Sequence, residues 1–386
     1  MRKWVVSGII ILLLPWLMSL VWMHQGGQAV SPVKEIQSGL EAENQAAGGA
    51  GAAPGTDSSD TANALAAAVE GLAAGVRGSG DGNKAGADMS AEAGTMADAG
   101  NGTSVGDGTS GTVTRKILLE RNGIRTYLAL EDYLPGVIIC QMNPEYSPEA
   151  LKCQAVIART YIYRLMNGRT EIHEEELDLD YLGEEAGVRP GRASLAEKEL
   201  AAENLGRCRK AVQETAGIVM RYEDRYVLPL FHAISAGRTR KGEADYPYLQ
   251  PVDSRWDTSR PDYKSTMEWS RAEFAGLVNQ IPDGQPVSAD QLPDQIQTVK
   301  KDDSEYILQM KIGAKTYTGE EIQYALGLPS ACFLLEGDGD RIRAVSRGSG
   351  HGYGLSQAGA DSMAKDGWGY EDILNYYYKN ISLTAE

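Results

Sequence analysis

The sequence predicts an α+β fold for residues 114–386, with helices and β-hairpins mixed in one large domain. Apolar alternation flanks turn signals such as Asn122-Gly123, a pattern typical of hairpins. The segment 148–168 instead spaces its apolar residues as a helix does. Strands and helices do not alternate regularly, so a parallel sheet with crossover helices is not expected.

The clearest predicted helix follows a hairpin at 117–130 and a short apolar segment at 132–140, whose pattern fits either helix or strand. Ser147 is a good N-cap, and Pro148 suits the first helical position. Glu149 favours the positive end of the helix dipole, and Gly168 is a plausible stop. One apolar stripe predicts packing against a core: Leu151, Ala155, Ala158, Ile162 and Leu165.

The remaining elements are expected in a mixed order. They are a helix ending near 215, a hairpin at 217–235, a polar loop at 236–265, a hairpin at 296–312 turning at 302–303, a helix at 319–327, a hairpin at 332–346, a glycine loop, and helices at 357–365 and 370–378.

The N-terminal third differs from this domain. Residues 4–23 carry no charge, and at 1.5 Å per residue about 20 residues span a bilayer core. Arg2 and Lys3 precede this run, so we expect residues 1–24 to be a signal-anchor that leaves the rest of the chain extracytoplasmic at the cell membrane. The alternative is a cleaved signal peptide, although no A-x-A site follows. Residues 25–113 are rich in Gly, Ala and acidic residues and lack aromatics, which predicts a disordered linker.

Composition excludes several classes of function. The formal net charge is −16, and the domain has no basic character, so nucleic acid is not an expected partner. The four cysteines, at positions 140, 153, 208 and 332, lack C-x-x-C spacing and indicate no zinc site or disulfide scaffold. Neither a cofactor nor a metal is expected.

The stretch RGSGHGYGLSQAGA (347–360) looks most like a functional site. Four alternating glycines permit positive φ and close approach of a ligand, unless they only form a structural turn. They bracket His351 and Tyr353, and Ser356 and Gln357 then lead into a helix whose free N–H groups suit ligand oxygens.

Three further polar residues are candidates. His232 ends a strand and is either an ordinary sheet-edge histidine or part of a binding surface with Ser235. Arg159 lies within the apolar helix beside the stripe. It either extends to solvent or points into a cleft to hold a carboxylate or sugar oxygen.

Several motifs together resemble the SpoIID/LytB family of peptidoglycan lytic transglycosylases. They are LPGVII-x-QM (134–142), PEALKCQAVIARTY (148–161), the stretch AVQETAGIVM (211–220), FHAISAGRT (231–239), YALGLPSACF (324–333) and HGYGLSQAGA with its trailing YEDILNYYY. The resemblance covers about 115–382, in order.

The resemblance implies that a glutamate before the Met of the first motif protonates the glycosidic oxygen, after which the muramic C6 hydroxyl closes a 1,6-anhydro ring. Here that position is Gln141, an amide that cannot serve as a general acid. Glu145 is the candidate substitute acid. The resemblance also implies substrate binding by Arg159, His232, Ser235, His351, Tyr353, Ser356 and Gln357.

Three hypotheses follow. The first is cleavage of glycan strands that lack stem peptides, with a relocated acid. The second is binding of the same strands without cleavage, as a scaffold or as a regulator of a cell-wall amidase. The third is a Cys–His hydrolase that pairs Cys140 or Cys153 with His351 or His232, which would need a thiolate in an electropositive setting. A role in sporulation or cell-wall remodelling fits the first two.

Overall fold

The computed structural model describes residues 114–386 except 122, 184–194, 283 and 285. The predicted anchor (1–24) and the predicted linker (25–113) lie outside the described residues. No helix in the part that the structure describes combines the length and apolar character needed to cross a membrane.

The described residues form a mixed α+β fold, as predicted, with seven α-helices and several small sheets. The helices are α5 (Leu130–Gln141), α6 (Pro148–Met166), α7 (Leu195–Glu214), α8 (Arg271–Val278), α9 (Gly319–Leu326), α10 (Gln357–Lys365) and α11 (Tyr370–Tyr377). Three short 3-10 turns lie at Glu174–Glu176, Arg255–Ser259 and Ala289–Gln291.

The strands pair mostly as antiparallel neighbours. They are β1 (Lys116–Arg121), β2 (Ile124–Ala129), β3 (Glu171–His173), β4 (Ile218–Tyr222), β5 (Arg225–Tyr226), β6 (Phe231–His232), β7 (Lys264–Ser270), β8 (Ile296–Lys301), β9 (Ile307–Ile312), β10 (Lys315–Tyr317), β11 (Phe333–Asp338), β12 (Arg341–Arg347), β13 (Leu355–Ser356) and β14 (Ser382–Ala385). The sheet orders are β2-β1-β3, β10-β9-β8, β11-β12-β7, β13-β6 and β14-β4-β5.

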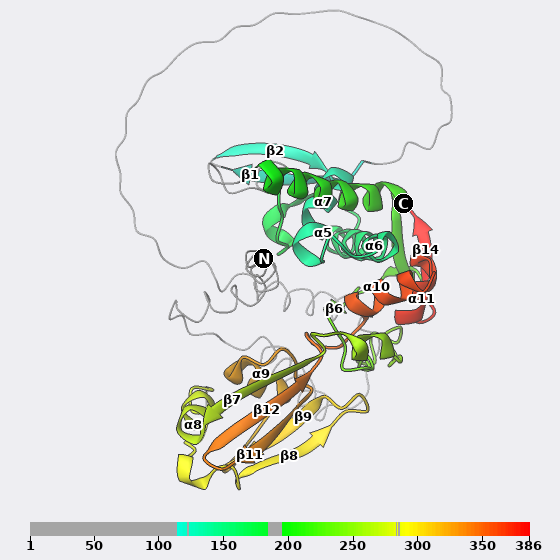
Figure 1. The fold of residues 1–386 in the computed structure, drawn as a ribbon. Helices are drawn as coiled ribbons and strands as arrows, with labels where there is room; N and C mark the ends of the chain where they lie inside the picture. The colour runs from blue at the N-terminus through cyan, green and yellow to red at the C-terminus, as the bar shows by residue number, and fades with distance from the viewer. Residues whose placement is uncertain (1–113, 122, 184–194, 283, 285) are drawn as a thin grey trace, which may run out of the picture. The chain divides into compact units, whose positions relative to one another are not determined.

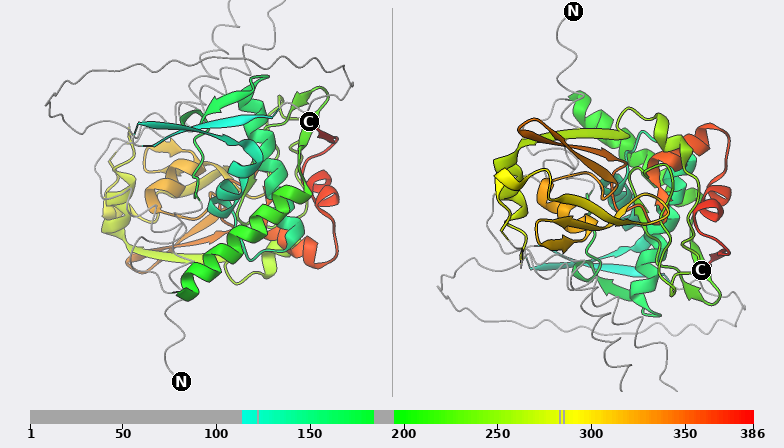
Figure 2. Two further views of the ribbon diagram at one scale, coloured as in Figure 1. Left: turned by 90° about the horizontal axis from the view of Figure 1, so that it is seen from above. Right: turned by 90° about the horizontal axis from the view of Figure 1, so that it is seen from below.

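Two hydrophobic clusters organise these elements. The first gathers α5, α6 and α7 with α10 and α11 (Figure 1), and α7 packs on both α5 and α6, as Figure 2 shows from two further sides. The second lies between α8, α9 and the sheets that contain β7, β9, β11 and β12. Arg240 and the glycine loop lie in the segments that join the two groups.

The start of α6 forms much as the sequence predicts. Ser147 is the N-cap and Pro148 the first helical residue, while Asn167 at φ 44° and Gly168 at φ 84° end the helix. The Ser147 side chain does not cap its own helix, because its Oγ donates to Asp361 Oδ1 of α10 at 2.8 Å. Glu149 Oε2 accepts from the Tyr370 backbone N–H at the start of α11. The N-terminus of α6 therefore ties α10 and α11 to the first cluster.

Other elements differ from the prediction. The expected hairpin at 217–235 is wrong in its second arm, since β4 pairs with the two-residue β5 and with the C-terminal strand β14. Residues 231–232 instead form β6, which pairs in parallel with β13. Both β7 and α8 were missed. By contrast, the hairpins at 296–312 and 332–346 are confirmed.

Candidate glycan-binding site

Gln141 is the last residue of α5, and its side chain belongs to a group of three amides. Gln154 Nε2 of α6 donates to Gln141 Oε1 at 2.8 Å. Gln357 Nε2 of α10 donates to the Gln141 backbone carbonyl at 2.9 Å and to Gln154 Oε1 at 3.2 Å. We call Gln141, Gln154 and Gln357 the glutamine cluster. It fixes the end of α5 against two other helices.

The three members differ in exposure. Gln154 is fully buried and Gln357 nearly so, whereas Gln141 is only half-buried. The Gln141 Nε2 group makes no hydrogen bond to any described residue, so it remains available to a ligand oxygen. An amide at this point can orient a sugar, but it has no proton to transfer at any physiological pH.

Glu145 lies in the turn between α5 and α6, four residues after Gln141. The turn is held by backbone contacts: Glu145 N donates to Asn143 Oδ1, and Arg207 donates to the carbonyls of Pro144 and Tyr146. The Glu145 side chain is exposed and makes no hydrogen bond to a described residue.

The glycine loop brings the two histidines together. Gly348, Gly350, Gly352 and Gly354 all have φ between 68° and 100°. His232 Nδ1 donates to the Tyr353 carbonyl at 3.0 Å, and the His232 and His351 rings lie 5.8 Å apart. His351 Nδ1 in turn accepts from the Tyr353 backbone N–H at 3.1 Å.

Both imidazoles are held in their neutral form. Burial, followed by the nearby His351, lowers the pKa of His232 to about 3. The edge of His351 is exposed, yet the surrounding protein and the charge of Arg240 lower its pKa as well. At neutral pH the pair therefore offers hydrogen-bonding groups without positive charge.

Two serines predicted to bind substrate turn inward. Ser235 Oγ donates to Asp257 Oδ2 at 2.5 Å, and Ser356 Oγ donates to Asp257 Oδ1 at 3.0 Å. Ser254 supplies a third hydroxyl to the same carboxylate. All four residues are fully buried, and burial raises the pKa of Asp257 against the effect of the serine hydrogen bonds. The serines join the glycine loop to the 3-10 turn at Arg255–Ser259.

Arg159 is not brought into the site. Its side chain is fully buried, and its Nε and Nη2 form a bidentate pair with Glu131, both at 2.7 Å. The remaining guanidinium hydrogen bonds go to Thr215 Oγ1 and to the carbonyls of Val212 and Ile218. The arginine neither extends to solvent nor faces a cleft. It links α6 to the start of α5 and to the end of α7.

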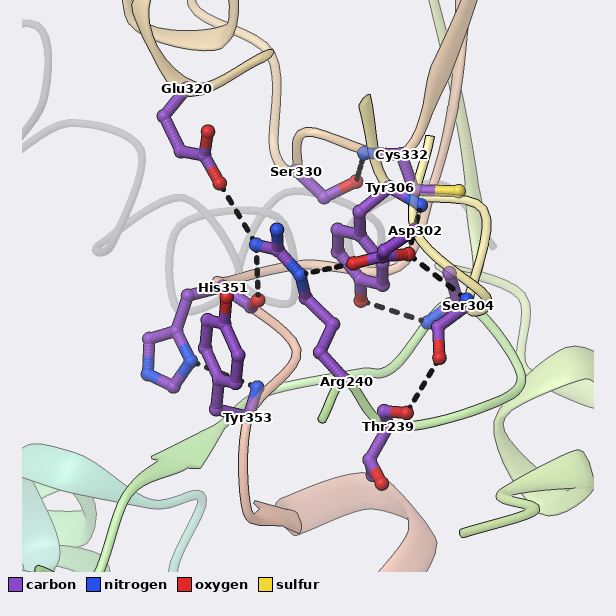
Figure 3. A network of polar contacts seen from close by, with 11 residues as sticks. Thr239, Arg240, Asp302, Ser304, Tyr306, Glu320, Ser330, Cys332, His351 and Tyr353 are labelled. Carbon is purple, nitrogen blue, oxygen red and sulfur yellow. Dashed lines mark hydrogen bonds and ion pairs between the residues drawn. The ribbon is translucent and has the colours of Figure 1, made fainter. Parts of the chain in front are cut away.

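A second arginine network supports the glycine loop from the other side (Figure 3). Arg240 Nε donates to Asp302 Oδ2 at 2.7 Å, and its Nη1 donates to Glu320 Oε1 at 2.8 Å and to the His351 carbonyl at 3.3 Å. The guanidinium also lies 4.6 Å from the centre of the Tyr353 ring. Arg240 was not predicted as a functional residue, because basic residues in a polar loop carry no local signal of such a network.

Comparison with known proteins identifies the group to which the chain belongs. Residues 120–222 match the family model of the stage II sporulation protein SpoIID. Stage II sporulation protein D of Bacillus subtilis is 32% identical over 263 residues, which cover 67% of this chain and 75% of the relative. Its counterpart in Bacillus amyloliquefaciens is also 32% identical, over 264 residues. The chain belongs to the SpoIID family.

A further relative of this SpoIID-family chain is more distant. The amidase enhancer of Bacillus subtilis is 24% identical over 307 residues, and the match spans 40% of that protein. The family model covers both Gln141 and Arg159, whereas the glycine loop lies beyond it.

The cysteines of this SpoIID-family chain lack the features of a nucleophile. All four are free thiols, and only Cys140 is exposed. Burial raises the pKa of Cys140 to about 11, and burial likewise raises the pKa of Cys153. Both thiols therefore stay protonated at neutral pH, which argues against the Cys–His hydrolase hypothesis. No three His, Cys, Asp or Glu side chains gather as a metal site within the described ranges.

Proposed function

We propose that this SpoIID-family protein is a cell-wall protein that binds peptidoglycan glycan strands lacking stem peptides and does not cleave them. Its domain would act outside the membrane, held there by the N-terminal anchor that the sequence predicts. Membership of the SpoIID family and the similarity to stage II sporulation protein D support a role in sporulation.

One observation carries the proposal: an amide stands where the resemblance implies a proton donor. Gln141 Oε1 is engaged by Gln154, and its half-buried Nε2 group is left to donate to a sugar oxygen. Forming a 1,6-anhydro end needs a proton on the leaving oxygen, and general acid catalysis of this kind contributes about 10²–10⁴ in rate. Binding survives the change from acid to amide, whereas proton transfer does not.

The similarity to an amidase enhancer supports a partner for this activity. An amidase that removes stem peptides would produce the strands that this protein holds. In our proposal the protein works beside such an enzyme and retains its product.

A second function, cleavage with Glu145 as the acid, is favoured only by the exposure of that carboxylate. A general acid must come within hydrogen-bond reach of the leaving oxygen. The Glu145 side chain forms no hydrogen bond with the described residues of the glutamine cluster, so we favour binding alone.

The test uses the full-length protein with amidase-treated peptidoglycan. We expect the protein to sediment with the strands and mass spectrometry to detect no anhydromuramic ends. Strands that do not bind would refute the proposal. Anhydromuramic products that disappear in Glu145→Gln would instead establish the second function.

A further inference from the structure

Cations gather on the outer face of the sheet β11-β12-β7, away from the glutamine cluster. Leu334 pairs with Val345, and Lys264 pairs with Arg347. Directly opposite residues of an antiparallel pair lie on the same face of a sheet. Since Ile342 and Ala344 of β12 are buried inside the second cluster, the alternate residues face outward. The outer face therefore has an apolar floor of Leu334 and Val345. Two cations, Lys264 and Arg347, lie on one side of it, and on the other Arg343 lies between Glu268 and Glu336.

Two adjoining hollows lie along this face and the neighbouring β8-β9 hairpin. One, of about 320 Å³, is lined by Leu334 and Val345 together with the cations Lys264, Lys301, Arg343 and Arg347. The other, of about 250 Å³, is lined by Lys241, Lys300 and Lys301 among its residues. Lys301 borders both hollows, which makes them one surface. We call this surface the basic track.

The basic track has more positive charge than the protein itself neutralises. Arg343 pairs with Glu336 and Lys301 with Glu305, both at 2.9 Å. Lys241, Lys264 and Lys300 form no ion pair with a described residue. Three acidic residues line the track: Asp302, Asp303 and Glu336. Arg240 engages Asp302 and Arg343 engages Glu336, so Asp303 alone stands against the three unpaired lysines. In a chain with a formal net charge of −16, such a local excess of cations favours an anionic ligand.

The track also adjoins the candidate site. Arg347 is the last residue of β12 and directly precedes Gly348 of the glycine loop. Lys241 follows Arg240, whose Nη1 donates to the His351 carbonyl. A polymer lying across the glycine loop can therefore continue onto the track.

The chemistry of the substrate supplies a matching anion. Hydrolysis of the amide between muramic acid and its stem peptide leaves a free lactyl carboxylate on each muramic residue. A strand without stem peptides is thus a regular polyanion with apolar sugar faces. Lysine and arginine bind carboxylates through charge-assisted hydrogen bonds, and an apolar floor suits the sugar faces.

We propose that the basic track is a second subsite that binds the lactyl carboxylates of glycan strands stripped of stem peptides. This inference rests on the proposed function and extends it. It gives a physical reason for selecting amidase-treated strands over uncharged glycans, because the glutamine cluster and the histidine pair carry no positive charge that would favour an anionic strand.

The experiment compares three probes with the full-length protein: amidase-treated glycan strands, chitooligosaccharides that lack the lactyl group, and purified wall teichoic acid. The double variant Lys264→Gln/Lys301→Gln removes two cations of the track. Because each exposed charge pair contributes modestly to binding, we expect the double variant to bind the glycan strands about tenfold more weakly and with a shallower salt dependence. Chitooligosaccharide binding is expected to be weak and unchanged. Lys210→Gln, an exposed cation of α7, is the matched control and should bind like the wild type.

The outcomes separate the two proposals. If the wild type binds no glycan strand, the proposed function fails and the subsite fails with it. If the wild type binds strands and the double variant binds them equally well, only the subsite is refuted. Chitooligosaccharides that bind as tightly as strands would also refute it. Teichoic acid that binds more tightly and loses affinity in the double variant would assign the track to a phosphodiester polymer instead.

Discussion

Arg159 shows how one residue can follow a family motif and still be fully buried in a hydrogen-bond network of the protein itself. Its guanidinium is fully occupied by Glu131, one hydroxyl and two backbone carbonyls. The sequence shows a charged residue in an apolar helix, which suggests that its side chain either extends to solvent or points into a cleft. The buried pair escaped prediction because Glu131 lies 28 residues away.

Replacing this arginine should affect stability rather than binding. We expect Arg159→Ala to lower the free energy of unfolding by about 3 kcal/mol, because it leaves the Glu131 carboxylate and the buried oxygens without their donor. Urea unfolding followed by circular dichroism measures the loss. Arg164→Ala, on the same helix with a single hydrogen bond to the Tyr226 carbonyl, should cost about 1 kcal/mol. If Arg159→Ala kept its stability and lost glycan binding, we would conclude that Arg159 contacts the substrate.

Gln141 differs from Arg159, because the sequence alone shows that this position lacks a proton donor. A glutamine side chain ends in an amide, which has no titratable proton. The structure adds its partners Gln154 and Gln357, which come from helices 13 and 216 residues away in sequence. The glycine-loop motif identifies Gln357 as a candidate, whereas Gln154 lies on a predicted helix without any functional signal.

At the scale of elements, the glycine loop explains why glycine recurs at every second position. A Cβ on Gly350 would lie 2.8 Å from His232 Cβ, and one on Gly352 would lie 2.5 Å from the Tyr306 ring. The loop thus needs both positive φ and the absence of side chains. The sequence predicts the permissive backbone but not the neighbours, because His232 of β6, Tyr306 and the glycine loop meet only in the folded chain.

The most crowded of these glycines gives a sharp prediction. Gly354 has φ 68°, and an added Cβ would meet the Leu230 carbonyl oxygen at 1.8 Å. We expect Gly354→Ala to cost more than about 3 kcal/mol or to prevent folding, since the close atom belongs to the backbone. Thermal unfolding tests this expectation against Gly367→Ala as the control.

Gly367 has φ 92° and no atom within 4 Å of its would-be Cβ. Its substitution carries only the backbone strain, about 1 kcal/mol. Equal melting temperatures for the two variants would contradict the close contact between an added Cβ at Gly354 and the Leu230 carbonyl oxygen.

Across the described part of the molecule, turn and cap residues predict the helices and hairpins that are local in sequence. They do not predict which strands pair over long sequence separations. The capped helix α6 and the hairpins around residues 302 and 339 follow from turn and cap residues. The strands β7 and β14 carry no comparable signal, because β7 pairs with β12 and β14 pairs with β4, more than 70 residues away in each case. The Asp257 carboxylate was missed for the same reason: its serines come from three separate segments.

The account at the level of the whole described domain depends on Gln141. The helices α5, α6 and α10 hold an amide in a half-buried position, and the rest of the site supplies neutral hydrogen-bonding groups. If this site binds glycan and lacks only an acid, restoring the acid should restore cleavage. Glu at position 141 can still accept the hydrogen bond from Gln154 Nε2.

The most direct measurement is therefore mass spectrometry of amidase-treated peptidoglycan after incubation with wild type, Gln141→Glu and Gln154→Glu. Gln154 is fully buried, so its variant adds a carboxyl group to the same cluster without reaching the substrate. We expect 1,6-anhydromuramic ends from Gln141→Glu alone, at a rate about 10²–10⁴ above the wild type. Equal cleavage by the wild type, or bound strands with no product from Gln141→Glu, would contradict the account.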